Sequence, residues 1–551
     1  MACRIRLLRF LWLVALCVLA HAVAAQDVDE YLRMRVEQLR ETGSLQIDSN
    51  AIAAITLIPE LYERRIFAPT WTRPEQVDGL IQIVKDSYGE GFDLADYHYA
   101  AIQSARKTLF GGGTVPPNRR ADLDLLLTDS LIRVGYHLRF GKVNPEQLDP
   151  NWNLDREILT DDPVATIQAA IDSDSLTNFR DQLLPRGFFY ERLKTALARY
   201  RAIERAGGWP VIEQGQTLRP EDIDPRVTAL ARRLMVTGDL QVLRAEPSDN
   251  HYDAALQPAV EAFQQRHGLI QDGIVGPATL AALNVPVERR VEQLRANLER
   301  TRWVFEDIED DFIIVNIAGF RVYLVRDGEV VWTTRAQVGK PFRQTPVFKS
   351  SMKYVVLNPT WTVPPTILAQ DILPRVRQDT GYLASRNIEI IDNSGQVVDP
   401  LSVDWSARRN FPYRFVQGPG PGNALGRVKF IFPNDHFVFL HDTPSRELFE
   451  RQDRAFSSGC IRVELPLELT SLLLSDEWDR ARIDDVMESG ETQTVFLEDP
   501  LTVMLLYWTT EVDDDGRVFF YADVYDRDRA VIDGLQKGYD ATLLTIGQLG
   551  E

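Results

Sequence analysis

The chain has 551 residues, of which 44% are hydrophobic and 26% charged, and a formal net charge of −19. This length exceeds what one hydrophobic core usually serves, so we expect two to four domains. The acidic balance disfavours nucleic acids and anionic lipid surfaces as partners, because both are bound mainly through positive charge. Neutral, zwitterionic and cationic partners stay open.

The first 25 residues have the three-part pattern of a secretory signal peptide. Arginines precede the apolar run LWLVALCVLA, and the small-residue segment HAVAA follows it. The run is shorter than the ~20 apolar residues that a membrane-spanning helix needs. We therefore expect export and cleavage after Ala24 or Ala25. Cleavage would remove Cys3 and Cys17, two of the three cysteines.

Hydrophobic periodicity divides the rest of the chain. Apolar residues recur every three or four positions in the first part, and the period changes to about two beyond residue 310, which indicates helices followed by strands. The predicted fold class is multidomain α+β. The expected order is a signal peptide (1–25), a helical scaffold domain (26–220), a small three-helix module (221–288), a connecting helix (289–309), a mainly β domain (310–500) with a helical insertion at 366–415, and C-terminal strands and a tail (501–551) that pack on the scaffold.

The cysteine that remains, Cys460, stands in the segment SSGCIR. A cysteine attacks as its thiolate and needs a base or a positive environment. His441 ends the apolar run FVFLH upstream, whereas His436 would face the other side of an extended strand. His441 is therefore the candidate base. The alternative for Cys460 is a buried, unreactive thiol.

Residues around Cys460 suggest how a reaction would be supported. Ser458 and Gly459 are small, and the amides of Gly459 and Cys460 are candidate donors to an oxyanion. Arg462 would favour the thiolate or bind a substrate carboxylate; the alternative is a structural ion pair with Glu464 or another acid. A zinc site made of His436, His441 and Cys460 would lack a fourth ligand. We therefore expect no metal, and no cofactor either.

The three-helix module resembles the peptidoglycan-binding domain of cell-wall enzymes. The resemblance rests on the segments AFQ, HGL, DG, GPxT and LN between Ala262 and Asn284. It implies attachment to the cell wall, either to sugar or to peptide.

The segments HDTP and SSGCIRVE resemble the active-site signature of the L,D-transpeptidase family, and so do QTP, NPTWTVPPTIL and PGNALG. Together with the helical region and the module, they match the large Gram-negative periplasmic members. The resemblance implies a cysteine nucleophile, a histidine base and a backbone carbonyl, here of Asp442, that orients the imidazole. Asn423 and Trp361 lie in matching segments and join Arg462 as substrate-binding candidates. Ser458 departs from the commoner histidine.

The implied function is a transferase that forms 3→3 peptidoglycan cross-links through a cysteine acyl-enzyme, in cell-wall biogenesis and the control of cell shape. The implied location is the periplasm. The implied partners are a tetrapeptide donor, a diaminopimelate acceptor and other cell-wall synthesis enzymes. The insertion at 366–415 would act as a lid. Two alternatives remain: an L,D-carboxypeptidase or hydrolase with the same acyl-enzyme, and a non-catalytic wall-binding scaffold.

Overall fold

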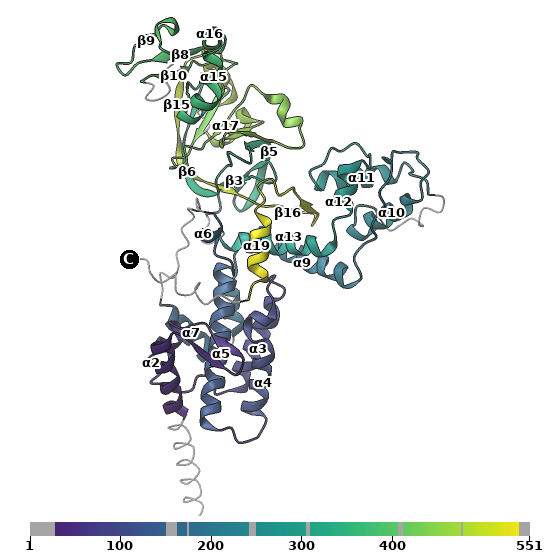
Figure 1. Ribbon diagram of the computed structural model, residues 1–551, viewed down its shortest axis with the longest axis vertical. Coiled ribbons are helices and arrows are strands. Elements are labelled where there is room, and N and C mark those ends of the chain that lie inside the picture. Colours follow the sequence, from purple (N-terminus) through teal and green to yellow (C-terminus); the bar gives the residue numbers. More distant parts are fainter. Residues whose placement is uncertain are drawn as a thin grey trace, which may run out of the picture.

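The computed structural model describes residues 28–149, 152, 162–173, 176–241, 250–304, 309–405, 412–474 and 478–538. The predicted signal peptide lies outside these residues. The molecule is elongated, with a helical region at one end, a β-rich region at the other and a small helical module to one side (Figure 1). Over the described ranges, no helix is long and apolar enough to cross a membrane.

The helical region is built around one buried helix, α5 (Pro117–Phe140). Its residues are apolar on several sides, so neighbours can pack all around it. Residues 28–42 are also helical, and a hairpin of β1 (Leu45–Ile47) and β2 (Asn50–Ile52) follows. The other helices are α2 (Leu57–Arg64), α3 (Pro74–Ser87), η1 (Leu94–Tyr97), α4 (Tyr99–Phe110), α6 (Pro145–Leu148), α7 (Pro163–Asp172), α8 (Leu176–Leu183) and α9 (Phe188–Arg205).

The three-helix module has its own core. It comprises α10 (Arg226–Thr237), α11 (Leu256–Arg266) and α12 (Pro277–Leu283), which enclose buried residues such as Leu234 and Phe263. The next helix, α13 (Val287–Arg302), runs between the helical region and the β-rich region and packs on α9 (Figure 1).

The β-rich region is a nine-stranded sheet. Its order is β13-β5-β14-β12-β11-β6-β15-β3-β4, and β4 also pairs with β5, so the sheet closes on itself. Asp327-Gly328, a dipeptide typical of tight hairpin turns, joins β4 to β5, and both residues have positive φ (51° and 74°), as a type I′ turn requires. The strands are β3 (Phe312–Asn316), β4 (Arg321–Arg326), β5 (Glu329–Gly339), β6 (Phe348–Leu357), β11 (Val428–Ile431), β12 (Leu440–His441), β13 (Ala455–Ser457), β14 (Ile461–Val463) and β15 (Gln493–Leu506). The helical elements are η4 (Arg446–Glu450), α17 (Pro466–Leu473) and α18 (Arg480–Ser489).

Strand β15 crosses the predicted boundary at residue 500. It pairs with β6 and β3 in the interior of the sheet, and its register shifts between Phe496 and Leu501. The irregularity accommodates Pro500, which cannot donate to the ladder. The nine-stranded sheet therefore extends to Leu506, and a boundary at 500 would cut one of its strands.

The insertion contains the predicted helices and, in addition, a four-stranded sheet in the order β7-β10-β8-β9. It spans 361–417 and has its own core, which includes Val376, Leu383 and Phe415. Its elements are β7 (Trp361–Thr362), α14 (Pro365–Ile367), the π-helical turn η2 (Leu368–Ile372), α15 (Leu373–Val376), α16 (Gly381–Ser385), β8 (Ile388–Ile391), β9 (Val397–Val398), η3 (Pro400–Ser402) and β10 (Arg414–Gln417).

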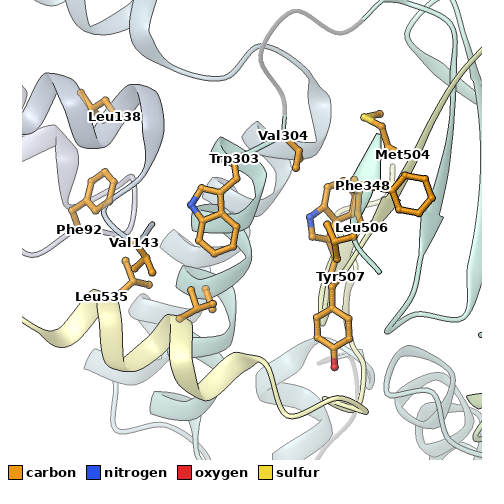
Figure 2. Close-up of a cluster of buried hydrophobic side chains, with 14 of the residues drawn as sticks. Phe92, Leu138, Val143, Trp303, Val304, Phe348, Met504, Leu506, Tyr507 and Leu535 are labelled. Atoms are coloured by element: carbon orange, nitrogen blue, oxygen red, sulfur yellow. The ribbon is translucent and has the colours of Figure 1, made fainter. Parts of the chain in front are cut away.

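The C-terminal segment joins the helical region to the sheet. It forms the hairpin β16 (Thr510–Val512) and β17 (Val518–Phe520) and the helix α19 (Asp528–Gln536). Trp303 at the end of α13 lies between side chains of the helical region and those of the sheet (Figure 2). One continuous hydrophobic cluster thus runs from the helices into the nine-stranded sheet. The predicted α+β arrangement is confirmed.

Candidate active site

Four polar side chains form a row across adjacent strands β5, β14, β12 and β11. Gln337 pairs with Arg462, Arg462 with His441, and His441 with Lys429. Directly paired residues point to the same face of a sheet, so these side chains, the polar row, share one face. Their neighbours along the strands face the apolar core: Ala336, Val338, Val428, Phe430, Leu440, Ile461 and Val463.

His441 is buried at the end of β12. Its Nδ1 lies within hydrogen-bond distance of the Asp442 carbonyl, which can only accept, so Nδ1 carries the proton. The Nε2 atom of the neutral ring is then free to accept a proton. Burial, together with the charges of Arg462 and Lys429, lowers the pKa of His441 to about 3. The imidazole is therefore neutral at physiological pH.

Cys460 is half-buried and directly precedes β14. Because β12 and β14 are parallel with Leu440 opposite Ile461, Cys460 lies opposite Phe439 and diagonally across from His441. Such diagonal neighbours on one face are about 7–8 Å apart at Cα, within reach of an imidazole and a thiol. Burial raises the pKa of the Cys460 thiol, while a backbone hydrogen bond from Phe439 and the charges of Lys429 and Arg462 oppose this. The resting Cys460 is thus a thiol whose Sγ donates to the Phe437 carbonyl (3.8 Å), and the neutral His441 imidazole lies on the same face of the sheet.

The residues before β14 form a tight turn, which we call the nucleophile loop (457–460). Ser457 Oγ donates to the Cys460 carbonyl (2.5 Å) and accepts from the Gly459 amide (3.1 Å). Gly459 has φ of 120°, a conformation that favours glycine. The Gly459 amide, a predicted oxyanion donor, is therefore engaged, whereas the Cys460 amide has no hydrogen-bond partner within the described residues.

Arg462 is not paired with Glu464. Its Nη1 donates to Gln337 Oε1 (3.0 Å), and the Glu464 carboxylate accepts instead from Arg335 Nε (2.8 Å). Arg462 Nε is buried and has no hydrogen-bond partner in the part of the chain that the structure describes. Arg462 therefore brings a positive charge to the face that carries Cys460, and the charge of Glu447 partly offsets it.

Two residues predicted to contact the substrate, Asn423 and Trp361, lie in the glycine-rich loop and in the insertion. Asn423 is buried and donates to the carbonyls of Pro359 (3.1 Å) and Gly418 (2.9 Å), while its Oδ1 accepts from Leu425 N (2.8 Å). Its polar atoms thus organise the glycine-rich loop and are not free for a ligand. Trp361 belongs to the insertion sheet and packs against the insertion core.

The Asp442 side chain fixes the loop beside His441. Its carboxylate accepts from Arg427 N (2.8 Å) and pairs with Arg446 (2.7 Å). A Cβ on Gly426, which has φ of 61°, would overlap this carboxylate. The sequence motif PGNALG thus contributes a close backbone approach here.

Arg343 connects the insertion to the nucleophile loop, and the sequence did not single it out. Its Nη1 donates to Asp371 Oδ2 (2.8 Å) and to Ser458 Oγ (2.8 Å), and it also contacts Gln370. Asp371 lies in the π-helical turn η2, a type of distortion that often occurs at functional sites. The sequence also did not predict three other residues of this region, Gln337, Lys429 and Thr345. Of these, Thr345 lies in the matching segment QTP.

No group of three histidine, cysteine, aspartate or glutamate side chains among the described residues could hold a metal ion. The site residues instead combine a thiol, a neutral imidazole, two cations and a free amide. This set suits nucleophilic acyl transfer at a cysteine.

Comparison with known families defines the class of this domain. Residues 310–483 match the L,D-transpeptidase catalytic domain, residues 224–283 a "Putative peptidoglycan binding domain", and residues 56–197 a scaffold domain. Residues 310–483 are thus similar to the L,D-transpeptidase catalytic domain, and the resemblance predicted from the sequence is confirmed.

A curated relative from Haemophilus influenzae, described as "Putative L,D-transpeptidase", is 38% identical over 242 residues. The match covers 44% of this chain and 49% of the relative, so the chain spans about half the length of that protein. Two solved structures also match: L,D-transpeptidases from Xylanimonas cellulosilytica (16% identity, TM-score 0.17, 53% of this chain and 98% of that one) and Stackebrandtia nassauensis (12%, 0.21, 54% and 96%). These TM-scores are too low to support an argument about the fold.

Proposed function

We propose that this protein is a periplasmic peptidoglycan L,D-transpeptidase that forms 3→3 cross-links through an acyl-enzyme on Cys460. The observation that carries the proposal is the polar row, which brings His441 and Arg462 to the face where Cys460 stands, inside a domain of this family. The peptidoglycan-binding domain on the same chain supports a wall substrate.

The first half-reaction would transfer the donor stem to sulfur. His441 Nε2 takes the thiol proton while Cys460 Sγ attacks the carbonyl carbon of the third stem residue. The bond to terminal D-alanine breaks, and His441 returns the proton to the leaving amine. Because the pKa of His441 is low and that of Cys460 is raised, a resting thiolate–imidazolium pair is disfavoured. Proton transfer would therefore accompany the attack.

The second half-reaction would form the cross-link. The side-chain amine of a diaminopimelate on a neighbouring stem attacks the thioester carbon, His441 takes a proton from this amine, and the carbon–sulfur bond breaks. The thiolate then recovers its proton from His441. The charges of Arg462 and Lys429 would stabilise the transient negative charge on sulfur and oxygen, and the Cys460 amide is the free backbone donor nearby.

The insertion would act as a lid over the acyl site. It has its own core, so it can move as a unit, and Arg343 ties it to the nucleophile loop. Deleting the insertion while cross-linking stays complete would refute this role.

The decisive experiment supplies purified tetrapeptide muropeptides and separates the products by mass. We expect 3→3 dimers and free D-alanine, with neither formed by Cys460→Ala. Tripeptide monomers without dimers would identify the L,D-carboxypeptidase instead. A protein that binds purified sacculi but converts no muropeptide would be the non-catalytic scaffold.

A further inference from the structure

The peptide unit between Gly459 and Cys460 is held from its carbonyl side. Thr345 Oγ1 donates to the Gly459 carbonyl at 2.8 Å, and Thr345 is fully buried. In a trans peptide the carbonyl and the amide of one unit point in opposite directions, and the described residues contain no cis peptide bond. The bond to Thr345 therefore fixes the direction of the Cys460 amide, which points away from Thr345.

Thr345 is itself held by two further hydrogen bonds. Its Oγ1 accepts from the Gly339 amide (2.9 Å), and its own amide donates to the Tyr525 hydroxyl (3.2 Å). The Tyr525 hydroxyl donates in turn to the Gly339 carbonyl (2.6 Å). A Cβ on Gly339 would overlap the carbonyl of Arg343, so the turn between Gly339 and Thr345 is close-packed. Tyr525 thus closes the base of the turn that carries Thr345.

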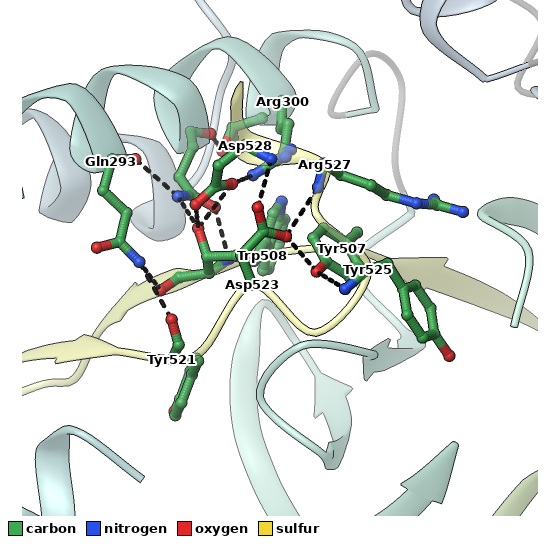
Figure 3. Close-up of polar contacts among 12 residues, drawn as sticks. Gln293, Arg300, Tyr507, Trp508, Tyr521, Asp523, Tyr525, Arg527 and Asp528 are labelled. Atoms are coloured by element: carbon green, nitrogen blue, oxygen red, sulfur yellow. Dashed lines mark hydrogen bonds and ion pairs between the residues drawn. The ribbon is translucent and has the colours of Figure 1, made fainter. Parts of the chain in front are cut away.

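Tyr525 belongs to the C-terminal segment, beyond the range that matches the catalytic domain. Its ring stacks on Tyr507, with centroids 5.5 Å apart, and its amide donates to the Tyr507 hydroxyl (2.9 Å; Figure 3). A second contact joins the same segment to the turn, because Arg527 Nη2 donates to Gln344 Oε1 (2.7 Å).

Helix α13 anchors this segment in turn. Asn297 and Thr509 exchange two hydrogen bonds of 2.9 Å, and Arg300 pairs with Asp528 (Figure 3). The support of the nucleophile loop therefore continues through the C-terminal segment to the helix that joins the helical region to the sheet.

We propose that Thr345 and Tyr525 are positioning residues for acyl transfer, which hold the Gly459–Cys460 peptide so that the Cys460 amide faces the developing oxyanion. The inference rests on the proposed function, because it assigns a supporting structure to the same acyl-enzyme. The C-terminal segment would then help to hold the nucleophile loop, although this segment lies outside the residues that match the catalytic domain.

The test compares two reactions of Cys460 in the full chain. Carbapenems are the covalent inhibitors that the family resemblance implies, and acylation by one needs an oxyanion donor, whereas alkylation by iodoacetamide does not. Intact mass follows both reactions. We expect Thr345→Val, which loses the hydroxyl at nearly constant volume, to be acylated about 10- to 100-fold more slowly, with alkylation unchanged. Thr345→Ser, which retains the hydroxyl, should restore acylation.

Tyr525→Phe provides an independent variant, and Tyr252→Phe its matched control. Tyr252 is likewise a buried tyrosine and donates to a glycine carbonyl, that of Gly273 (2.5 Å), but in the three-helix module. Only Tyr525→Phe should slow acylation selectively. Wild-type acylation rates in both Thr345→Val and Tyr525→Phe, or an equal loss of acylation and alkylation, would overturn the inference. A wild-type protein that no carbapenem acylates would instead refute the proposed function.

Discussion

The polar row and the insertion surround the same cysteine but are built in different ways. Each residue of the row sits on a strand whose other face is packed in the core, and consecutive residues are paired in register. The insertion encloses its own core and meets the nucleophile loop through the side chain of Arg343. From this difference we propose a division of labour, in which the sheet positions the catalytic residues and the insertion controls access to them.

Replacing His441 tests whether the polar row carries the chemistry, and it should have the largest effect on the acylation rate of Cys460. His441→Gln keeps a polar side chain but removes the base, so acylation of Cys460 should slow by about 10²- to 10⁴-fold. Intact mass against time with a carbapenem measures the rate. Alkylation by iodoacetamide at alkaline pH serves as the control and should not change; unimpaired acylation would show that His441 is not the base.

The same variant should change how stability depends on pH. The folded-state pKa of His441 is about 3, below the ordinary 6.5, so the unfolded chain binds the extra proton first as the pH falls. Stability from this group is complete above pH 6.5 and is lost on acidification toward pH 3. Between pH 7 and pH 4 the wild type should lose about 3 kcal/mol more than His441→Gln. Denaturant unfolding at both pH values measures this, and equal losses would mean that the ring is not held neutral.

Cutting the connection to the insertion should have the smallest effect, and one of a different kind. Asp371→Asn weakens the ion pair between the insertion and Arg343, while Ser458→Ala removes the contact of Arg343 with the nucleophile loop. Because Asp371 is half exposed, each change is worth about 1 kcal/mol, or roughly a fivefold rise in KM for stem peptides. Carbapenem acylation should stay near the wild-type rate. If Asp371→Asn or Ser458→Ala slowed acylation as much as His441→Gln does, the polar row and the insertion would not have different roles.

Local patterns in the sequence predicted the features that depend on neighbouring residues. The Asp327-Gly328 turn, the strand ending at His441 and the isolated Cys460 follow from residue type and spacing. The expected boundary at residue 500 falls inside β15, because the register shift between Phe496 and Leu501 lets one strand continue past Pro500.

Contacts between distant segments could not be predicted in this way. Tyr525 and Thr345 are 180 residues apart, and no periodicity links them. Asn423 lies in a glycine-rich segment that would suit a ligand equally well, and only its buried hydrogen bonds show that it serves the loop.

Mapping a covalent adduct tests the central claim most directly. The intact protein is treated with a carbapenem, its mass shift is recorded, and the modified peptide is sequenced by fragmentation, with Cys460→Ala as the control. Our account predicts one adduct per chain, located on Cys460 and missing from the variant. An adduct that persists in Cys460→Ala, or a wild-type chain that is never modified, would contradict it.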